Sequence, residues 1–135
     1  MTGKKFRLKI ITPFRVVYDE TVDGVKAPGL SGNFGVLANH LPMLTALGVG
    51  VIEVDAGSST ILFATSGGYS EVFYNEMTIL AETAEPSGEI DPERAARARD
   101  RALERLKSSS PEIDVGRARS ALARSLNRLH LSGAK

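Results

Sequence analysis

The feature that most constrains this chain is an abrupt change of composition at residues 85–88. All five phenylalanines and all three tyrosines lie before residue 75, whereas the residues after position 88 are rich in alanine, arginine, leucine and glutamate, which favour helices. Pro86 and Gly88 stand at the change, and both residue types commonly mark the ends of regular elements. The sequence therefore predicts two units, a β domain of residues 1–86 and a helical unit of residues 87–135.

Apolar and polar residues alternate in the first unit, as they do in half-buried strands. Phe6, Leu8 and Ile10, for example, alternate with charged residues. Turns are expected at several points, including residues 19–20 and 28–29. Because no helical periodicity interrupts these strands, we expect an antiparallel β-sandwich and, with the second unit, an α+β fold. The expected strands cover residues 6–10, 16–18, 21–26, 49–55, 60–65, 68–72 and 77–81.

Two amphipathic helices are expected in the second unit. Asp91 can cap the first helix, which must end before Pro111, and Asp114 can cap the second. Such an antiparallel hairpin of about 45 residues buries too little apolar surface to be stable alone, so it must dock on the β domain, a partner or a ligand. The faces expected to meet carry apolar residues at helical spacing: Ala95, Ala98, Ala102 and Leu106 in the first helix, and Val115, Ala118, Leu122, Leu126 and Leu129 in the second.

The composition excludes several kinds of site. The chain has no cysteine, so disulfides and thiolate sites are excluded, and no metal site is expected because its two histidines lie ninety positions apart. No nucleophile has a recognisable base nearby, so we expect no catalytic residue and no enzymatic activity. No apolar run approaches the roughly 18 residues of a membrane span. No signal or transit segment is expected either.

Several motifs occur in an order typical of one family. They read GNFGVLANHLPMLTAL at residues 32–47, SGGYSEV at 66–72, TILA at 78–81 and IDPERA at 90–95. From about residue 5 to residue 131, the chain thereby resembles the epsilon subunit of F-type ATP synthases. This resemblance implies the same architecture, an N-terminal β-sandwich followed by a C-terminal two-helix hairpin.

The resemblance also implies a function. In that family the subunit belongs to the rotor of a proton-translocating machine, where its β domain grips the gamma subunit and touches the loops of the c-ring. The helices fold against the sandwich or extend toward the catalytic alpha and beta subunits, where they oppose ATP hydrolysis. We therefore expect a non-catalytic regulatory subunit at the cytoplasmic face of the bacterial plasma membrane, in contact with the membrane only through the complex.

Four residues are expected at the rotor interface, in or near the first motif: Ser31, Asn33, His40 and Pro42. Many family members carry an acidic residue where this chain has Asn33, so a charge-based contact with the c-ring is in doubt here. An ordinary turn at residues 31–33 is the alternative. For His40 we expect a structural role, in which its ring nitrogens bond loop carbonyls.

Arginines form a stripe on each expected helix, because their spacings are three, four or seven residues. Two solvated basic faces are one interpretation, and an anionic partner is the other, either the acidic rim of the catalytic subunits or ATP. No cofactor is required, and ATP would be a regulatory ligand that is sensed and not hydrolysed, since there is no Walker-type loop. The resemblance implies the ATP-binding set Glu85, Ile90, Asp91, Arg94, Ala95, Arg101, Arg117, Arg124 and Arg128.

Two other functions compete with this one. An arginine-striped hairpin could follow the phosphates of a nucleic acid, which would make the chain a small basic binding module. Against it, residues 1–85 carry a net charge of −3, the aromatic residues follow strand alternation as core residues do, and acidic residues interrupt the arginines. We therefore expect no nucleic-acid partner. A generic adaptor is the least specific alternative.

Overall fold

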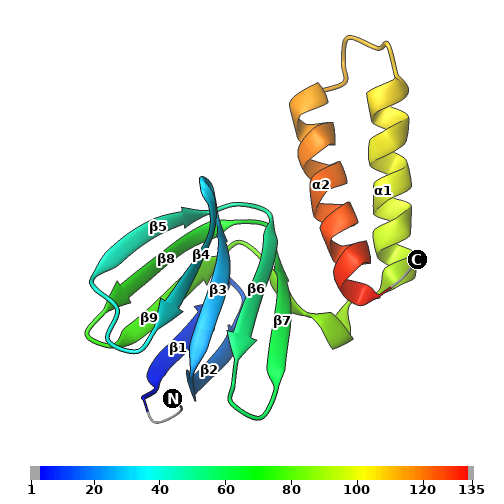
Figure 1. Cartoon of the computed structure of the whole chain (residues 1–135). Coiled ribbons are helices and arrows are strands. Elements are labelled where there is room, and N and C mark those ends of the chain that lie inside the picture. The colour runs from blue at the N-terminus through cyan, green and yellow to red at the C-terminus, as the bar shows by residue number, and fades with distance from the viewer. Residues whose placement is uncertain (1–3, 134–135) are drawn as a thin grey trace.

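Ten short strands make up the first part of the computed structural model, which describes residues 4–133. β3 joins the two layers of the sandwich, because it pairs with β6 at its start and with β5 only at Gly29. The hydrogen-bonded order is β10-β7-β6-β3-β5-β8-β9-β1-β2, with β4 on β3 (Figure 1). The strands are β1 (Phe6–Ile11), β2 (Val16–Val22), β3 (Gly24–Gly29), β4 (Gly32–Leu37), β5 (Met43–Leu47), β6 (Gly50–Asp55), β7 (Thr60–Thr65), β8 (Gly68–Phe73), β9 (Glu76–Ala81) and β10 (Ala84–Pro86).

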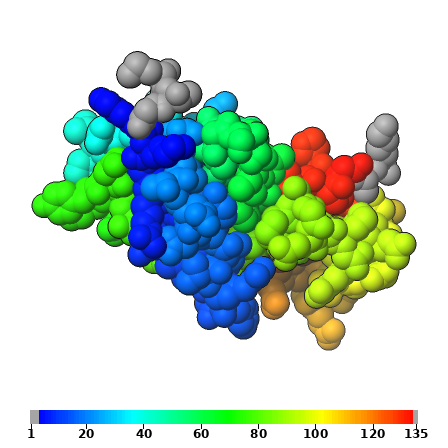
Figure 2. Space-filling view, turned by 90° about the horizontal axis from the view of Figure 1, so that it is seen from below, coloured from blue at the N-terminus to red at the C-terminus, as the bar shows by residue number. Residues whose placement is uncertain are grey.

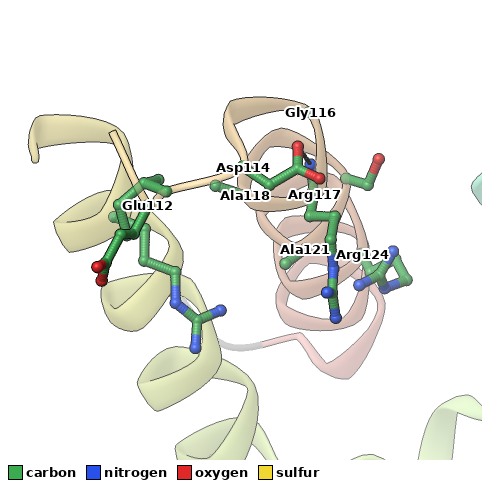
Figure 3. A pocket seen from close by; sticks show the side chains of 10 residues that line it. Glu112, Asp114, Gly116, Arg117, Ala118, Ala121 and Arg124 are labelled. Carbon is green, nitrogen blue, oxygen red and sulfur yellow. Dashed lines mark hydrogen bonds between the residues drawn. The ribbon is translucent and has the colours of Figure 1, made fainter. Parts of the chain in front are cut away.

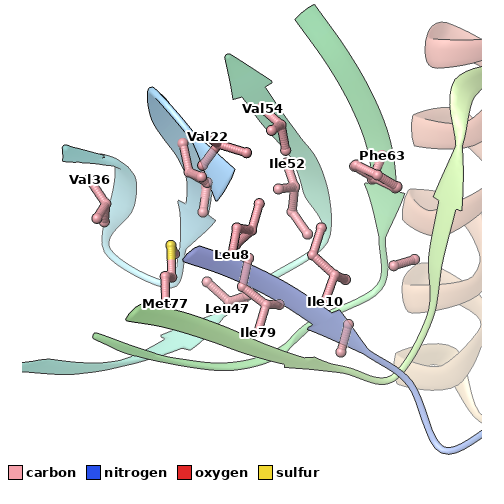
Figure 4. Packing of buried hydrophobic residues seen from close by; sticks show 14 of the residues in the cluster. Leu8, Ile10, Val22, Val36, Leu47, Ile52, Val54, Phe63, Met77 and Ile79 are labelled. Atoms are coloured by element: carbon pink, nitrogen blue, oxygen red, sulfur yellow. The ribbon is translucent and has the colours of Figure 1, made fainter. Parts of the chain in front are cut away.

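The core lies between the two layers and consists of inward-facing residues from the strands. Leu8 and Ile10 of β1 are fully buried, as the alternation along this strand predicts (Figure 4). They pack in one cluster with residues of β6, β7 and β9, among them Ile52, Phe63 and Ile79. Every buried member of this cluster lies in the strands, so the sandwich has a core that does not depend on the helices.

The predicted fold class is confirmed, with one exception in the sheet: β1 and β9 run parallel, while all the other strand pairs of residues 4–133 are antiparallel. The turn predicted at residues 19–20 is wrong, because both residues lie within β2. Arg7 of β1 holds Asp19 by a hydrogen bond of 2.8 Å, which lowers the pKa of that carboxyl. Charged side chains on the outer face of an edge strand are compatible with pairing, and this explains the error.

The turn predicted at residues 28–29 is also wrong, because both residues lie in β3. Three strands were not predicted: β4, β5 and the short β10. Strand propensity did not predict β4, because its residues Gly32 and Gly35 are poor strand formers.

Two helices follow the strands and form the predicted antiparallel hairpin. A 3₁₀ turn, η1 (Ser87–Glu89), leads into α1 (Pro92–Lys107), and α2 (Val115–Ser132) returns. Asp91 and Asp114 cap the helices as predicted, since their carboxylates accept backbone N–H groups of the first turns at 3.0–3.2 Å. Gly133, in the left-handed conformation at φ 79°, ends α2.

Small residues bring the two helices together. Ala95 and Ala102 of α1 are buried, and the buried positions of α2 are Ala118 and Ser125. The predicted face of α2 is wrong at Val115 and Leu126, which are about half exposed (48% and 47%). Positions 118, 122, 125 and 129 also repeat with helical spacing, and small side chains at two of them permit close approach of the helix backbones. Choosing the face by hydrophobicity alone therefore missed Ser125.

The hairpin docks on the sandwich through the last turns of α2. These turns contact β6, β7 and η1, and Asn127 donates a hydrogen bond of 2.7 Å from Nδ2 to the backbone oxygen of Gly50. In Figure 2 the end of α2, in red, lies beside the green of the neighbouring strands. The turn between the helices projects away from the sandwich (Figure 1). Neither helix is long and apolar enough to cross a membrane.

Candidate functional site

A pocket of about 310 Å³ lies where the hairpin joins the sandwich. Its volume is at the lower end of the range of small-molecule sites. Four elements or their flanking residues contribute to it: β10, η1, α1 and α2. It gathers seven of the nine residues predicted to bind ATP: Glu85, Ile90, Asp91, Arg94, Ala95, Arg101 and Arg128. We call it the junction pocket.

All three carboxylates that line the junction pocket have partners, and that of Glu89 lies 3.6 Å from the guanidinium of Arg15. Asp91 accepts hydrogen bonds from the backbone N–H groups of Glu93 and Arg94, so its carboxylate holds the first turn of α1. Glu85 of β10 accepts a hydrogen bond of 2.6 Å from Nε of Arg128 on α2, and both side chains are about one-third exposed. This charged pair links the sandwich directly to the second helix, where partial burial strengthens it relative to a surface pair.

Only one of the three arginines that line the pocket makes an ion pair with a residue that the structure describes. Arg128 is paired with Glu85, whereas Arg94 and Arg101 are exposed and make no ion pair with any residue that the structure describes. Arginine guanidinium groups bind phosphate oxygens with two parallel hydrogen bonds. The junction pocket can therefore bind an anion between α1 and β10, and such an anion would compete with Glu85 for Arg128.

Arg117 and Arg124 lie elsewhere. Arg117 is eleven residues from Arg128 along α2, a separation of about 16 Å along the helix axis. It lines a second hollow near the hairpin turn, and Arg124 lines both that hollow and the contact of α2 with Thr65 and Ser66 of the sandwich. The structure thus does not bring all nine predicted residues to one pocket.

The predicted rotor-interface residues form two groups at opposite ends of β4. Ser31 is exposed in the turn before this strand, and Asn33 is exposed near its start. His40 and Pro42 lie in the loop after it. Nδ1 of His40 lies 2.7 Å from the backbone oxygen of Leu41, so the predicted hydrogen bond from its ring to a loop carbonyl is confirmed.

An exposed apolar surface on the sandwich was missed by the sequence analysis. On the outer face of one layer, five residues stand opposite one another across adjacent strands and form what we call the outer apolar row: Ala46, Tyr69, Leu80, Ile11 and Val16. Tyr69, Leu80 and Val16 are 55–60% exposed. The interpretation of all aromatic residues as core is wrong for Tyr69 and Phe73, and also for Phe14 and Tyr74, which are more exposed still.

A signal for this row was present in the sequence. Tyr69 and Leu80 occupy the positions between the inward-facing residues of their strands, so both faces of β8 and β9 carry apolar side chains. Apolar residues on both faces of a strand indicate that its outer face is covered by another molecule or another part of the chain. Among residues 4–133, no group of three or more acidic or histidine side chains is placed to hold a metal ion.

Two domains of one known protein family together match almost the whole described chain. Residues 5–87 match the beta-sandwich domain of the ATP synthase delta/epsilon chain, and residues 89–133 match its long alpha-helix domain. The chain belongs to the ATP synthase delta/epsilon chain family. The resemblance predicted from the motifs is thereby confirmed.

Relatives within this family are similar over most of their length. The ATP synthase epsilon chain of Desulforamulus reducens is 46% identical over 110 residues, which are 82% of this chain and 83% of that protein. The epsilon chain of Nitratidesulfovibrio vulgaris is 47% identical over 103 residues, or 76% and 77% of the two chains. A chain from the Euglena gracilis mitochondrial ATP synthase has the same fold, with a TM-score of 0.81 at 23% identity over 94% of this chain and 81% of that one.

The outer apolar row and the junction pocket each contain residues of a motif that carries the family resemblance. The SGGYSEV motif of this epsilon-like chain contains Tyr69 of the outer apolar row, and the IDPERA motif forms the α1 side of the junction pocket. The motifs that carry the family resemblance therefore coincide with exposed or pocket-lining residues as well as with the core.

Proposed function

We propose that this chain is the epsilon subunit of a proton-translocating F-type ATP synthase and that it acts as a non-catalytic part of the rotor. Its sandwich would dock on the gamma subunit and meet the c-ring loops, at the cytoplasmic face of a bacterial plasma membrane. Its hairpin would restrain ATP hydrolysis when it extends toward the catalytic alpha and beta subunits. The observation that carries this proposal is a sandwich with a core of its own, joined to a hairpin that contacts it mainly through α2, in a chain of this family.

The outer apolar row is the part of the sandwich best suited to a permanent protein partner. It crosses five strands, and its exposed side chains would lose contact with water in a complex. We assign it to the gamma subunit. Ser31 and Asn33 lie at the exposed β3–β4 turn beside the exposed Leu30, and their polar side chains fit the polar loops of a c-ring.

Replacing Leu80 with glutamate tests this assignment. Leu80→Glu would place an unpaired charge in the centre of an apolar interface and is expected to weaken binding to the gamma subunit by about 100-fold. Thr60→Glu adds the same charge at an exposed position on the other layer and should bind as the parent does. Surface plasmon resonance with purified gamma subunit measures both. Equal affinity for the parent and Leu80→Glu would exclude the outer apolar row as the docking surface.

The junction pocket would bind ATP and couple it to the hairpin. Arg94 and Arg101 would hold phosphate oxygens, and Arg128 would exchange its bond with Glu85 for one with the nucleotide. Because the pocket is shared between sandwich and hairpin, ATP would bind the docked hairpin only. A tenfold excess of ATP over its Kd would then stabilise the docked state by about 1.4 kcal/mol.

Calorimetric titration of the full chain with ATP tests this coupling. Arg94→Gln is expected to weaken ATP binding about tenfold, the effect of one lost charged hydrogen bond. Arg97→Gln removes the same charge one turn along α1, outside the junction pocket, and should leave the affinity unchanged within about twofold. Absence of heat with the parent at millimolar ATP would rule out nucleotide sensing, and the rotor role would stand without it.

A further inference from the structure

The second hollow in the hairpin begins about one helical turn beyond the junction pocket, because Arg105 and Arg124 each lie four residues from an arginine of that pocket. It is a groove of about 740 Å³ between α1 and α2 near the turn that joins them, and Figure 3 shows it from close by. We call it the distal groove. Arg105 enters it from α1, and Arg117 and Arg124 enter it from α2. Arg105 is not among the residues that the family resemblance assigns to ATP.

The three guanidinium groups of the distal groove are unpaired. None has a carboxylate oxygen within 4.0 Å among residues 4–133. Two carboxylates also line the groove, but Asp114 is turned to the backbone, where it accepts the N–H of Arg117 at 3.1 Å. The carboxylate of Glu112 lies on the α1 side, away from Arg117 and Arg124 (Figure 3).

The packing of the helices brings these three charges near one another. Ala102 and Ala118 are buried between α1 and α2, so the backbones run close together just where the arginines stand. Like charges brought near one another on facing helices repel. An anion between them would remove this repulsion and accept several charged hydrogen bonds at once, with the hydroxyl of Ser120 as a further donor at the edge of the groove.

We propose that the distal groove is a binding site for a phosphate group, separate from the junction pocket, in which Arg105, Arg117 and Arg124 act as the ligands. The fork of each guanidinium fits two oxygens of a tetrahedral phosphate, and the groove has room for inorganic phosphate or for a short phosphate chain. Bound phosphate would join α1 to α2 and stabilise the hairpin as a unit. This inference does not depend on ATP binding in the junction pocket.

Titration of the ¹⁵N-labelled full chain with inorganic phosphate, at constant ionic strength in chloride, tests the proposal. We expect saturable shifts of the amide and arginine side-chain signals at residues 105, 117 and 124. Arg105→Gln and Arg117→Gln should each weaken phosphate binding about tenfold. Arg119→Gln, which removes the same charge from an exposed position of α2 outside the groove, should leave it unchanged. Helix content by circular dichroism verifies that each variant folds.

Two further arms separate the possible sources and sites. The first arm compares the affinity for tripolyphosphate with that for inorganic phosphate. If tripolyphosphate binds at least tenfold more tightly and Arg105→Gln weakens its binding, the preferred ligand is a phosphate chain. If the two affinities are equal, the preferred ligand is a single phosphate. Arg94→Gln alters only the junction pocket and should leave phosphate binding in the distal groove intact. Likewise, Arg105→Gln should leave ATP binding intact if the proposed nucleotide site is correct.

The proposal is overturned by either of two results. One is an absence of saturable shifts at residues 105, 117 and 124 in the parent up to about 50 mM phosphate. A dissociation constant above that concentration would be weaker than the affinity that two or three charged hydrogen bonds predict. The other is an equal loss of affinity in Arg105→Gln and Arg119→Gln, which would indicate general attraction of anions to a basic helix pair.

Discussion

Replacing Gly68 with alanine is expected to lower the free energy of unfolding of the sandwich by about 4 kcal/mol, a large share of the stability of a domain this size. Gly68 begins β8 with a φ of 142°, a conformation that residues with a Cβ rarely adopt. A Cβ at this position would overlap the backbone oxygen of Leu80 and lie 2.9 Å from Cα of Ala81 in the paired strand β9. The two strands would have to separate.

The same corner of the sandwich supports the hairpin. Gly67, next to Gly68, accepts a hydrogen bond from the N–H of Glu82 at 2.9 Å, and the hydroxyl of Thr83 donates to that of Ser66 at 2.7 Å. Ser66 and Thr83 also line the contact with α2. We therefore expect Gly68→Ala to weaken the docking of the hairpin together with the sheet.

Gly32→Ala is the matched control, because Gly32 also has a positive φ (132°) but no atom within 4 Å of a Cβ built there. It should cost only the backbone strain, about 1–2 kcal/mol. Urea unfolding followed by circular dichroism compares the two variants, since the chain has no tryptophan. A loss in Gly68→Ala no greater than that in Gly32→Ala would contradict the predicted clash of β8 with β9.

The sequence predicts the fold where one physical signal dominates. Alternation predicts β1, because one face of the strand must be buried. Asp91 and Asp114 predict where the helices begin, because their carboxylates accept the backbone N–H groups that have no partner within the first turn. It fails where signals conflict, as in β4, whose glycines oppose its pairing with β3. Prediction from the sequence also fails where the small volume of a side chain decides its burial more than its hydrophobicity does, as for Ser125 in the contact between the helices.

The candidate site is predictable only in part. Motif residues on consecutive segments, such as Ile90, Asp91 and Arg94, come together because a helix start and the turn before it are local structure. The pairing of Glu85 with Arg128 depends on how the hairpin docks, which no local pattern encodes. For the same reason, the sequence cannot divide the α2 arginines between the junction pocket and the distal groove.

Removal of residues 87–135 is expected to have the largest effect on function. The buried core cluster lies wholly within the strands, so the remaining sandwich should fold and keep the outer apolar row for the rotor. The hairpin would be lost, and with it the proposed restraint on hydrolysis. If the hairpin holds about nine-tenths of the complexes inactive when ATP is scarce, its removal raises the hydrolysis rate about tenfold.

The direct test is the rate of ATP hydrolysis at low ATP by ATP synthase assembled with the full chain or with residues 1–86. We expect the truncated subunit to remain in the complex at full stoichiometry while the rate of hydrolysis rises about tenfold. Equal hydrolysis rates in the two complexes, with both forms of the subunit bound, would contradict this expectation.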